Sequence, residues 1–294
     1  GEVERHCLEA CDVVGDAVGV AVASELDDGA AGDPDLDRVG LGRVVSGTAG
    51  DRQRIGVGAA IEQRVGVDKA GLSLVGLGAV EINGTLSEDN ATYDTPTLAE
   101  WLKETGGYTG GGVGITIGAD NVSISGITVK DALWGIELAD GADGTTLADV
   151  VLESNVYGIY KQATSAITEL SITGGSISDG FIGINFDMAV GGGTASGVTI
   201  DGTGFEHLLR KGIYVETLSD AHLTNITMDD VGQFGGTTFN GSLGAGGNGI
   251  NVNLKFGDYS DIEIDNFTLN NVGASDRDGL DANGHQNGGA IVIA

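Results

Sequence analysis

The sequence is poor in the residues that usually stiffen a chain or give it positive charge. Its 294 residues include two prolines and two cysteines, 5% are aromatic, and 14 Lys and Arg stand against 43 Asp and Glu. Two cysteines in one short segment, Cys7 and Cys11, cannot provide a disulfide framework. A formal net charge of −29 repels phosphate backbones, so nucleic acid is not an expected partner. No apolar run approaches the ~20 residues of a membrane-spanning helix, so membrane insertion is not expected either.

Glycine is what the sequence has in excess. It accounts for 53 of the 294 residues, against ~7% of an average protein. The glycines follow no every-third-residue period and proline is scarce, which excludes collagen. Hydrophobic residues make up 40% of the chain, too many for a disordered acidic segment. We therefore expect a folded acidic protein punctuated by glycine.

The composition changes along the chain. Residues 1–48 form an atypical segment rich in Gly, Ala, Asp and Arg, without any Phe, Tyr or Trp. Since an ordinary core uses aromatic side chains, we expect this segment to be poorly ordered, a propeptide or a linker from a larger protein. Residues 49–294 are expected to form one domain.

A Gly-Ile pair recurs through that domain. The pairs begin at Gly114, Gly135, Gly158, Gly183, Gly212 and Gly249, with a looser copy at Gly289. Two further alternating runs lie between successive pairs, such as Val122–Ile124 and Ile127–Val129. Three short period-2 strands per repeat predict the coil of a parallel β-helix, which buries its apolar residues only by stacking on the next coil. The rival β-sandwich would join its strands by hairpins at ~8–12-residue spacing.

The start of this domain carries a family resemblance. Ala49-Gly50-Asp51 precedes Ile55 and Val57, and a second run holds Glu62, Val65, Val67, Lys69, Gly71, Leu72, Leu74 and Gly76. Together with the Gly-Ile coils, this pattern resembles right-handed parallel β-helix proteins of the pectate-lyase-like kind and the β-helix regions of large secreted bacterial proteins. The resemblance implies an all-β solenoid of about seven or more coils, a secreted, cell-surface or periplasmic location, and polysaccharide as partner. None of that superfamily's catalytic signatures is intact.

Two features lie outside the coils. Residues 95–105 predict one short helix, a cap or side excursion, because Thr97 and Glu100 form a capping box and glycines follow it. The sequence of residues 289–294 predicts an apolar strand with an open edge. We expect further coils or another subunit to cover that edge.

Strand alternation predicts a row of outward side chains. If each Gly-Ile isoleucine points inward, the next residue points outward. The row is Thr116, Glu137, Tyr160, Asn185, Tyr214 and Asn251. Rings offer flat faces to sugars, and amides and carboxylates bind hydroxyls, so Glu137, Tyr160, Asn185, Tyr214 and Asn251 are candidate substrate-binding residues, with His207 nearby. Outward residues are also polar for solubility alone, which leaves the non-binding interpretation open.

The same alternation places two carboxylates side by side. Asp187 and Glu216 lie on neighbouring coils in one outward row, so the distance between their carboxyl groups would approach the ~5 Å separation of retaining glycosidases. Alternatively, these two carboxylates bind Ca²⁺. Arg210 or Lys211 would then remove the proton α to a sugar carboxylate, as a lyase or an epimerase does. Lys161 would point inward, where an unpaired ammonium is costly, so we expect its strand to end at Tyr160.

Loops complete the prediction. Long inserts at 206–211, 232–248 and 273–288 would wall a groove beside the outward row. A second calcium candidate within them groups acidic residues and an amide at close spacing without matching an EF-hand. Its ligands would be Asp276, Asp278, Asp281 and Asn283.

Two functions follow from these patterns. The first is a module that recognises an acidic or neutral polysaccharide, either by binding alone or also as a lyase, an epimerase or a glycosidase. The second is a structural or adhesin-type segment without activity. Apart from Ca²⁺, no cofactor is expected.

Overall fold

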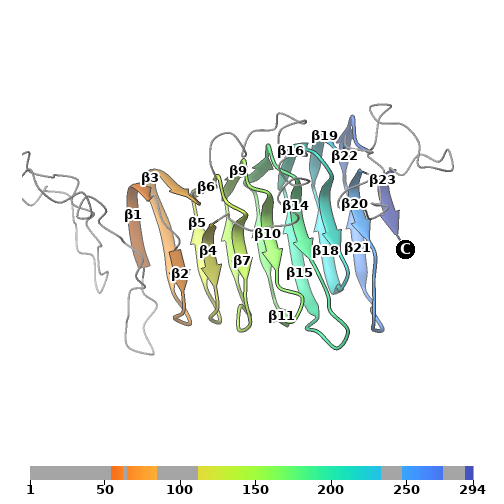
Figure 1. Cartoon of the computed structure of the whole chain (residues 1–294), viewed down its shortest axis with the longest axis horizontal. Helices are drawn as coiled ribbons and strands as arrows, with labels where there is room; N and C mark the ends of the chain where they lie inside the picture. Colours follow the sequence, from red (N-terminus) through yellow and green to blue (C-terminus); the bar gives the residue numbers. More distant parts are fainter. Residues whose placement is uncertain (1–53, 62–64, 85–111, 233–246, 274–288, 294) are drawn as a thin grey trace, which may run out of the picture.

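The computed structural model describes residues 54–61, 65–84, 112–232, 247–273 and 289–293. These residues form strands β1 to β23, which stack in one solenoid along the long axis of the molecule (Figure 1). They contain no helix, and hence none that is long and apolar enough to cross a membrane. The predicted parallel β-helix is confirmed. The helix predicted at 95–105 and the segment 1–48 lie outside the described residues.

One wall of the solenoid is an eight-stranded parallel sheet. Its strands, in spatial order, are β2 (Val65–Val67), β4 (Val113–Ile117), β7 (Trp134–Leu138), β10 (Tyr157–Lys161), β14 (Ile182–Phe186), β17 (Lys211–Val215), β20 (Asn248–Val252) and β23 (Gly289–Ile293). From β4 onward, the isoleucine of each Gly-Ile pair is in register with that of the next strand. The repeat seen in the sequence is therefore the stacking repeat of the solenoid.

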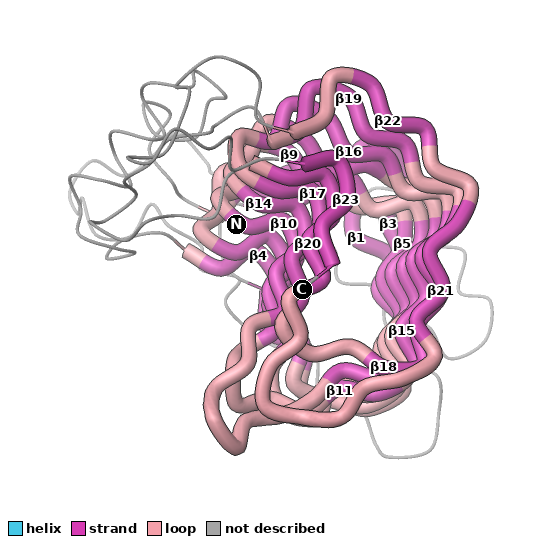
Figure 2. Tube along the Cα trace, turned by 90° about the vertical axis from the view of Figure 1, so that its right-hand side faces the viewer, coloured by secondary structure: helices cyan, strands magenta, loops and turns pink. Residues whose placement is uncertain are grey.

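A fifteen-stranded sheet forms the other two walls, and Figure 2 shows all three walls along the solenoid axis. Its long strand β3 (Ser73–Asn83) belongs to both walls and pairs with β1 (Arg54–Ile61). The second wall contains β5 (Ser123–Ser125), β8 (Thr146–Ala148), β11 (Ile167–Thr168), β12 (Ser171–Thr173), β15 (Ala195–Asp201), β18 (Ser219–Thr224) and β21 (Ile262–Asp265). The third wall contains β6 (Thr128–Lys130), β9 (Val151–Glu153), β13 (Ser176–Ser178), β16 (Gly204–Leu208), β19 (Thr227–Val231) and β22 (Thr268–Asn270).

The corners between walls explain the abundance of Gly, Asn and Asp. Most corners turn on one or two residues with positive φ, a left-handed conformation that glycine, asparagine and aspartate adopt most readily. In the corner between the second and third walls, these residues are Gly126, Asp149, Gly174, Gly175, Gly202, Asn225 and Asn266.

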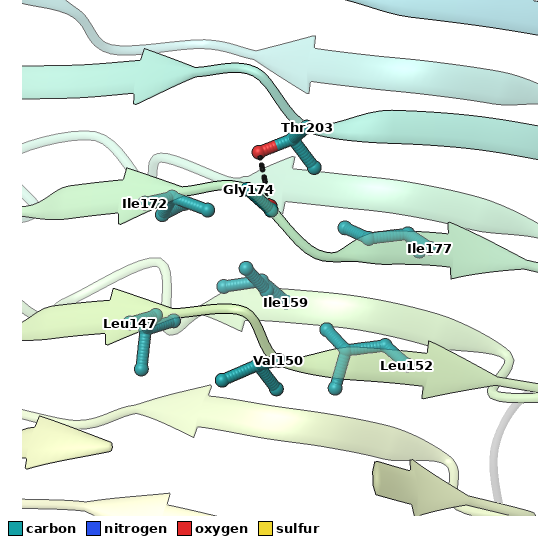
Figure 3. A pocket seen from close by; sticks show the side chains of 8 residues that line it. All are labelled: Leu147, Val150, Leu152, Ile159, Ile172, Gly174, Ile177 and Thr203. Atoms are coloured by element: carbon teal, nitrogen blue, oxygen red, sulfur yellow. Dashed lines mark hydrogen bonds between the residues drawn. The ribbon is translucent and has the colours of Figure 1, made fainter. Parts of the chain in front are cut away.

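The interior is a continuous aliphatic core that runs from Val67 to Val252. Figure 3 shows a gap in it, bounded by side chains of all three walls, where the Thr203 hydroxyl donates to the Gly174 carbonyl at 3.0 Å. The gap has a volume of about 10 Å³, which admits one water molecule at most. This part of the interior is a packed core with no space for a ligand.

Candidate functional site

The glycines of the Gly-Ile pairs determine what the eight-stranded sheet presents outward. A Cβ on Gly158 would lie 2.6 Å from the Gly183 carbonyl oxygen and 2.6 Å from Cγ2 of the core residue Ile177. Gly158 thus faces the core, as does Ile159, and the alternation of the strand is broken between them. As a result Tyr157 and Tyr160, on either side of this pair, both face outward and pack together.

The outer face therefore carries two rows of side chains. The predicted row, from Thr116 to Asn251, is confirmed in register from strand to strand. The second row precedes the glycines and comprises Trp134, Tyr157, Ile182, Lys211 and Asn248. Sequence reasoning missed Trp134, Tyr157 and Asn248 because it assumed unbroken alternation. The recurring glycine before each isoleucine was the signal in the sequence, because it marks the position where a side chain would collide with the neighbouring strand and the core.

Aromatic rings cover the middle of this face. Trp134 and Tyr160 stack with ring centroids 4.7 Å apart and an interplanar angle of 10°, and Tyr157 lies 5.8 Å from Tyr160. They pack on an apolar cluster outside the core that comprises Leu133, Val156, Phe181, Ile182 and Leu209. Stacked, half-buried rings give this surface a rigid apolar platform.

A group of titratable side chains lies beside the rings, where β14, β17 and β20 end. Glu216 is 8% exposed. Its Oε1 accepts hydrogen bonds from the Tyr214 hydroxyl at 2.5 Å and from the Lys255 ammonium, and its Oε2 accepts from the Met188 amide at 3.1 Å. Burial alone would raise the pKa of Glu216, but the bonds from Lys255, Tyr214 and Met188 together hold it below its ordinary value.

The structure brings Asp187 next to Glu216, as predicted. Phe186 and Val215 are in register, so the two carboxylates follow neighbouring strands. Burial and then the charge of Glu216 raise the pKa of Asp187, against a hydrogen bond from Asn185 that lowers it. Two neighbouring carboxyl groups thus have pKa values pushed in opposite directions, a common feature of reactive sites.

Cations surround these carboxylates. The Lys211 ammonium lies 3.9 Å from the centroid of the Tyr214 ring, and the residue is 3% exposed. Burial, and next the charge of Arg210, lower the pKa of Lys211 to about 7. Arg210 itself lies over the Phe181 ring at 5.7 Å. Of the seven Lys and Arg among the described residues, Arg210, Lys211 and Lys255 gather here. Lys161 interacts with the charges of both carboxylates from inside the solenoid.

Lys161 corrects one prediction. Its strand β10 does not end at Tyr160 but includes Lys161, whose side chain is buried inside the solenoid with 0% exposed. The ammonium donates to the carbonyl oxygens of Gln162 at 2.8 Å, Ser165 at 2.8 Å and Gly193 at 3.1 Å. Three acceptors match its three protons, so the ammonium is not left unpaired. Burial still lowers its pKa to about 8.

The predicted loops are placed differently. Residues 206–208 belong to β16 and Lys211 begins β17, so 206–211 is no insert, and the other two predicted inserts lie almost wholly outside the described residues. The longer described segments, 187–194 and 253–261, instead follow the eight-stranded sheet. The second one reaches back across two coils, since the Tyr259 hydroxyl donates to the Lys255 carbonyl at 2.6 Å and lies 2.9 Å from the Met188 sulfur. It thereby holds Lys255, which sequence reasoning missed, on Glu216.

The remaining candidates do not join this group. His207 lies in β16 with φ 50°, and its Nδ1 lies 3.3 Å from a carboxylate oxygen of Asp179. The calcium candidates Asp276, Asp278, Asp281 and Asn283 lie outside the described residues. Within the described ranges, no group of three or more His, Cys, Asp and Glu could hold a metal ion. Lys255 forms an ion pair with Glu216, one member of the Asp187–Glu216 pair.

Comparisons of the chain with protein-family models, with curated proteins and with solved structures find no match.

Proposed function

We propose that the outer face of the eight-stranded sheet binds an acidic polysaccharide and cleaves it by β-elimination. The observation that carries this proposal is the gathering of Lys211 and Lys255 at two carboxylates, with Arg210 near Lys211, beside a platform of stacked rings, in a chain of net charge −29. The protein would act on a bacterial cell surface or after secretion, as the resemblance to pectate-lyase-like proteins implies.

The rings and amides suit a sugar chain. Trp134 and Tyr160 offer a flat apolar surface to a pyranose face, and Tyr214 lies two strands further along the same row. Strands are spaced ~4.8 Å apart, so Tyr160 and Tyr214 are roughly 10 Å apart, a span comparable to two sugar rings. Neutral glycans would use these rings but not the cations, which is why we favour an acidic one.

The titratable groups suit proton abstraction from a uronate. Arg210 and Lys255 would neutralise the sugar carboxylate, which makes the proton on the adjacent carbon acidic. Lys211, with a pKa of about 7, has a neutral amine fraction near neutral pH and would take that proton as general base. The released electron pair forms the new C=C bond, the glycosidic C–O bond breaks, and the leaving oxygen takes a proton from solvent water.

The same geometry argues against hydrolysis through a glycosyl-enzyme. Hydrogen bonds from Tyr214, Lys255 and Met188 to both carboxylate oxygens lower the nucleophilicity of Glu216. Its arrangement suits a residue that positions Tyr214 and Lys255. Epimerisation shares the first proton abstraction and differs only in reprotonation of the same carbon.

The test is incubation of the protein with alginate, pectate, glucuronan and neutral glucans, with and without Ca²⁺. Ultraviolet absorbance of unsaturated ends and the release of reducing ends are followed together. We expect both signals to rise on at least one acidic glycan. Reducing ends without absorbance would indicate a glycosidase instead, and a requirement for Ca²⁺ would support the loop at Asp276–Asn283 as its site.

A second candidate is a structural or adhesin-type segment without activity. It is favoured by the exposed apolar side chains of Ile291 and Ile293 on β23, 42% and 72% exposed, which a further strand would cover. Neither binding nor turnover on any glycan of the panel would support this function and contradict the first.

A further inference from the structure

Phe256 is an exposed aromatic residue next to the titratable group. It is 59% exposed, on the segment 253–261 that follows the eight-stranded sheet. Apart from two residues of β23, the one other exposed large apolar residue in the described ranges is Val190, on the segment 187–194. Single exposed apolar residues are common on protein surfaces, so the exposure of Phe256 needs a second observation before it indicates a function.

The second observation is the backbone of Phe256, which has a φ of 61°. This left-handed conformation is unfavourable for a bulky side chain. The other residues with positive φ in the described ranges are Gly, Asn, Asp, Ser, Glu or His, so Phe256 carries the one large apolar side chain among them. Such outliers cost stability and are concentrated at functional sites. A strained and exposed ring therefore indicates a role other than supporting the fold.

The loop after Lys255 is fixed at both ends. At its start, the Lys255 amide donates to the Glu216 carbonyl at 2.9 Å, and the Tyr259 hydroxyl donates to the Lys255 carbonyl at 2.6 Å. At its far end, the Asp220 amide donates to the Ser260 carbonyl at 3.0 Å. These hydrogen bonds to the preceding coil and within the loop impose its path, so the exposed ring that it carries is held in a defined place.

That place adjoins the charged part of the outer face. Phe256 directly follows Lys255, whose ammonium donates to Glu216, and consecutive Cα atoms are ~3.8 Å apart. A uronate whose carboxylate approaches Lys255 would therefore bring an adjoining sugar within reach of the Phe256 ring. Trp134 and Tyr160 lie on β7 and β10, whereas Phe256 follows β20, beyond β14 and β17 in the order of strands. Aromatic rings thus stand before and after the titratable group along the solenoid axis.

The chemistry of a single ring suits a sugar better than a protein partner. A pyranose presents a flat face of C–H groups that covers one aromatic ring, and an uncharged ring does not compete for the sugar carboxylate. A protein partner would need a contiguous apolar patch of several side chains.

We propose that Phe256 is a substrate-binding residue that stacks on the sugar next to the uronate held by Lys255, an inference that rests on the proposed function. Its strained backbone is then the cost of presenting a ring where the loop itself would favour asparagine or glycine. Bound glycan would contact Trp134 and Tyr160 at one end and Phe256 at the other.

The experiment measures dissociation constants by calorimetry for oligosaccharides of alginate, pectate and glucuronan. Phe256→Leu keeps an apolar side chain without a flat ring and should weaken binding of the preferred ligand about fivefold. Phe256→Trp keeps a ring and should bind within about twofold of the unmodified protein. The matched control Val190→Ala, an exposed apolar residue without a ring on the other segment, should leave the constant unchanged.

A stability measurement separates binding from folding. Phe256→Asn should weaken binding as Phe256→Leu does, yet raise the midpoint of urea unfolding, because asparagine adopts the left-handed conformation more readily. A fall of both the midpoint and the affinity in this variant would assign the ring to the fold and overturn its role in binding.

The outcomes distinguish the two proposals. Unchanged binding in Phe256→Leu, or an equal loss in Phe256→Leu and Phe256→Trp, would overturn the stacking role of Phe256 while the proposed function stands. No binding of the unmodified protein to any of these oligosaccharides would overturn the proposed function, and the role of Phe256 with it.

Discussion

The two sheets of this solenoid turn similar apolar side chains inward and very different side chains outward. On the fifteen-stranded sheet the outward residues are mostly small and half-buried, as Ser123 and Ser171 are. On the eight-stranded sheet they include Glu137, Asn185 and Lys211, all buried. Small hydroxyl side chains are enough for solubility, since water makes their hydrogen bonds. Burying amides and charges is costly unless they are paired, so the second kind indicates a surface built for something other than contact with water.

The largest expected difference between the sheets concerns activity. Lys211→Met should lower the elimination rate by ~10²–10⁴-fold, the usual contribution of a general base. Lys130→Met is the matched control, because Lys130 pairs with Glu81 at 2.9 Å on the fifteen-stranded sheet. Initial rates on the acidic glycan check this. An equal loss in both variants would show that the two sheets do not differ in function.

The pH dependence of the rate sharpens the same point. Activity should rise as the pH passes about 7, where Lys211 loses its proton. The charge of Glu216 raises the pKa of Lys211, so Glu216→Gln should move this rise to lower pH. Glu81→Gln, on the other sheet, should leave the pH profile in place. A shift to higher pH in Glu216→Gln would contradict the assignment of Lys211 as base.

The next effect concerns stability of the eight-stranded sheet. A Cβ at Gly183 would lie 2.5 Å from the Gly212 carbonyl oxygen and 2.8 Å from Cδ1 of Phe205, so Gly183→Ala should cost about 2–3 kcal/mol of unfolding free energy through overpacking. At Gly118 the nearest atoms would be 3.9 Å away, and Gly118→Ala should change stability by less than about 0.5 kcal/mol. Urea unfolding of both variants tests whether the glycine row maintains the outer face.

Buried Lys161, on a strand of the eight-stranded sheet, should make the stability of the protein depend on pH. Burial lowers its pKa to about 8 from the ordinary 10.5. Between these values the unfolded chain binds more protons, so the unfolding free energy should rise with pH, by about 2 kcal/mol between roughly pH 7 and pH 9.5. Lys161→Met should lack this contribution in urea unfolding at the two pH values. The same rise in the variant would assign it to other groups.

The smallest effect concerns binding. Tyr160→Ala removes the ring stacked on Trp134 and should weaken glycan binding about tenfold, within the ~0.5–1.5 kcal/mol of an aromatic contact. Ser171→Ala on the fifteen-stranded sheet should have no effect on the dissociation constant. If the two variants bind equally well, the rings serve only packing.

Much of the fold could be predicted from the sequence because one isoleucine per coil is repeated with little ambiguity. The Gly-Ile pairs predicted the register of the eight-stranded sheet, and with it the row from Thr116 to Asn251 and the juxtaposition of Asp187 and Glu216. Period-2 alternation failed at the glycines, where close approach of neighbouring backbones turns Trp134 and Tyr157 outward. It also led to the wrong end for the strand of Lys161, because an inward lysine is excluded only when no acceptors surround it.

The sequence by itself determined the coil, its inward aliphatic residues and the order of residues along each outer row, since these depend on spacing within one coil. Only the tertiary structure decided which outward groups are buried and paired. Lys255 reaches Glu216 from 39 residues away, and three carbonyls from two coils converge on Lys161. These contacts depend on how loops of unequal length fold across neighbouring coils. Local periodicity holds no information about that path.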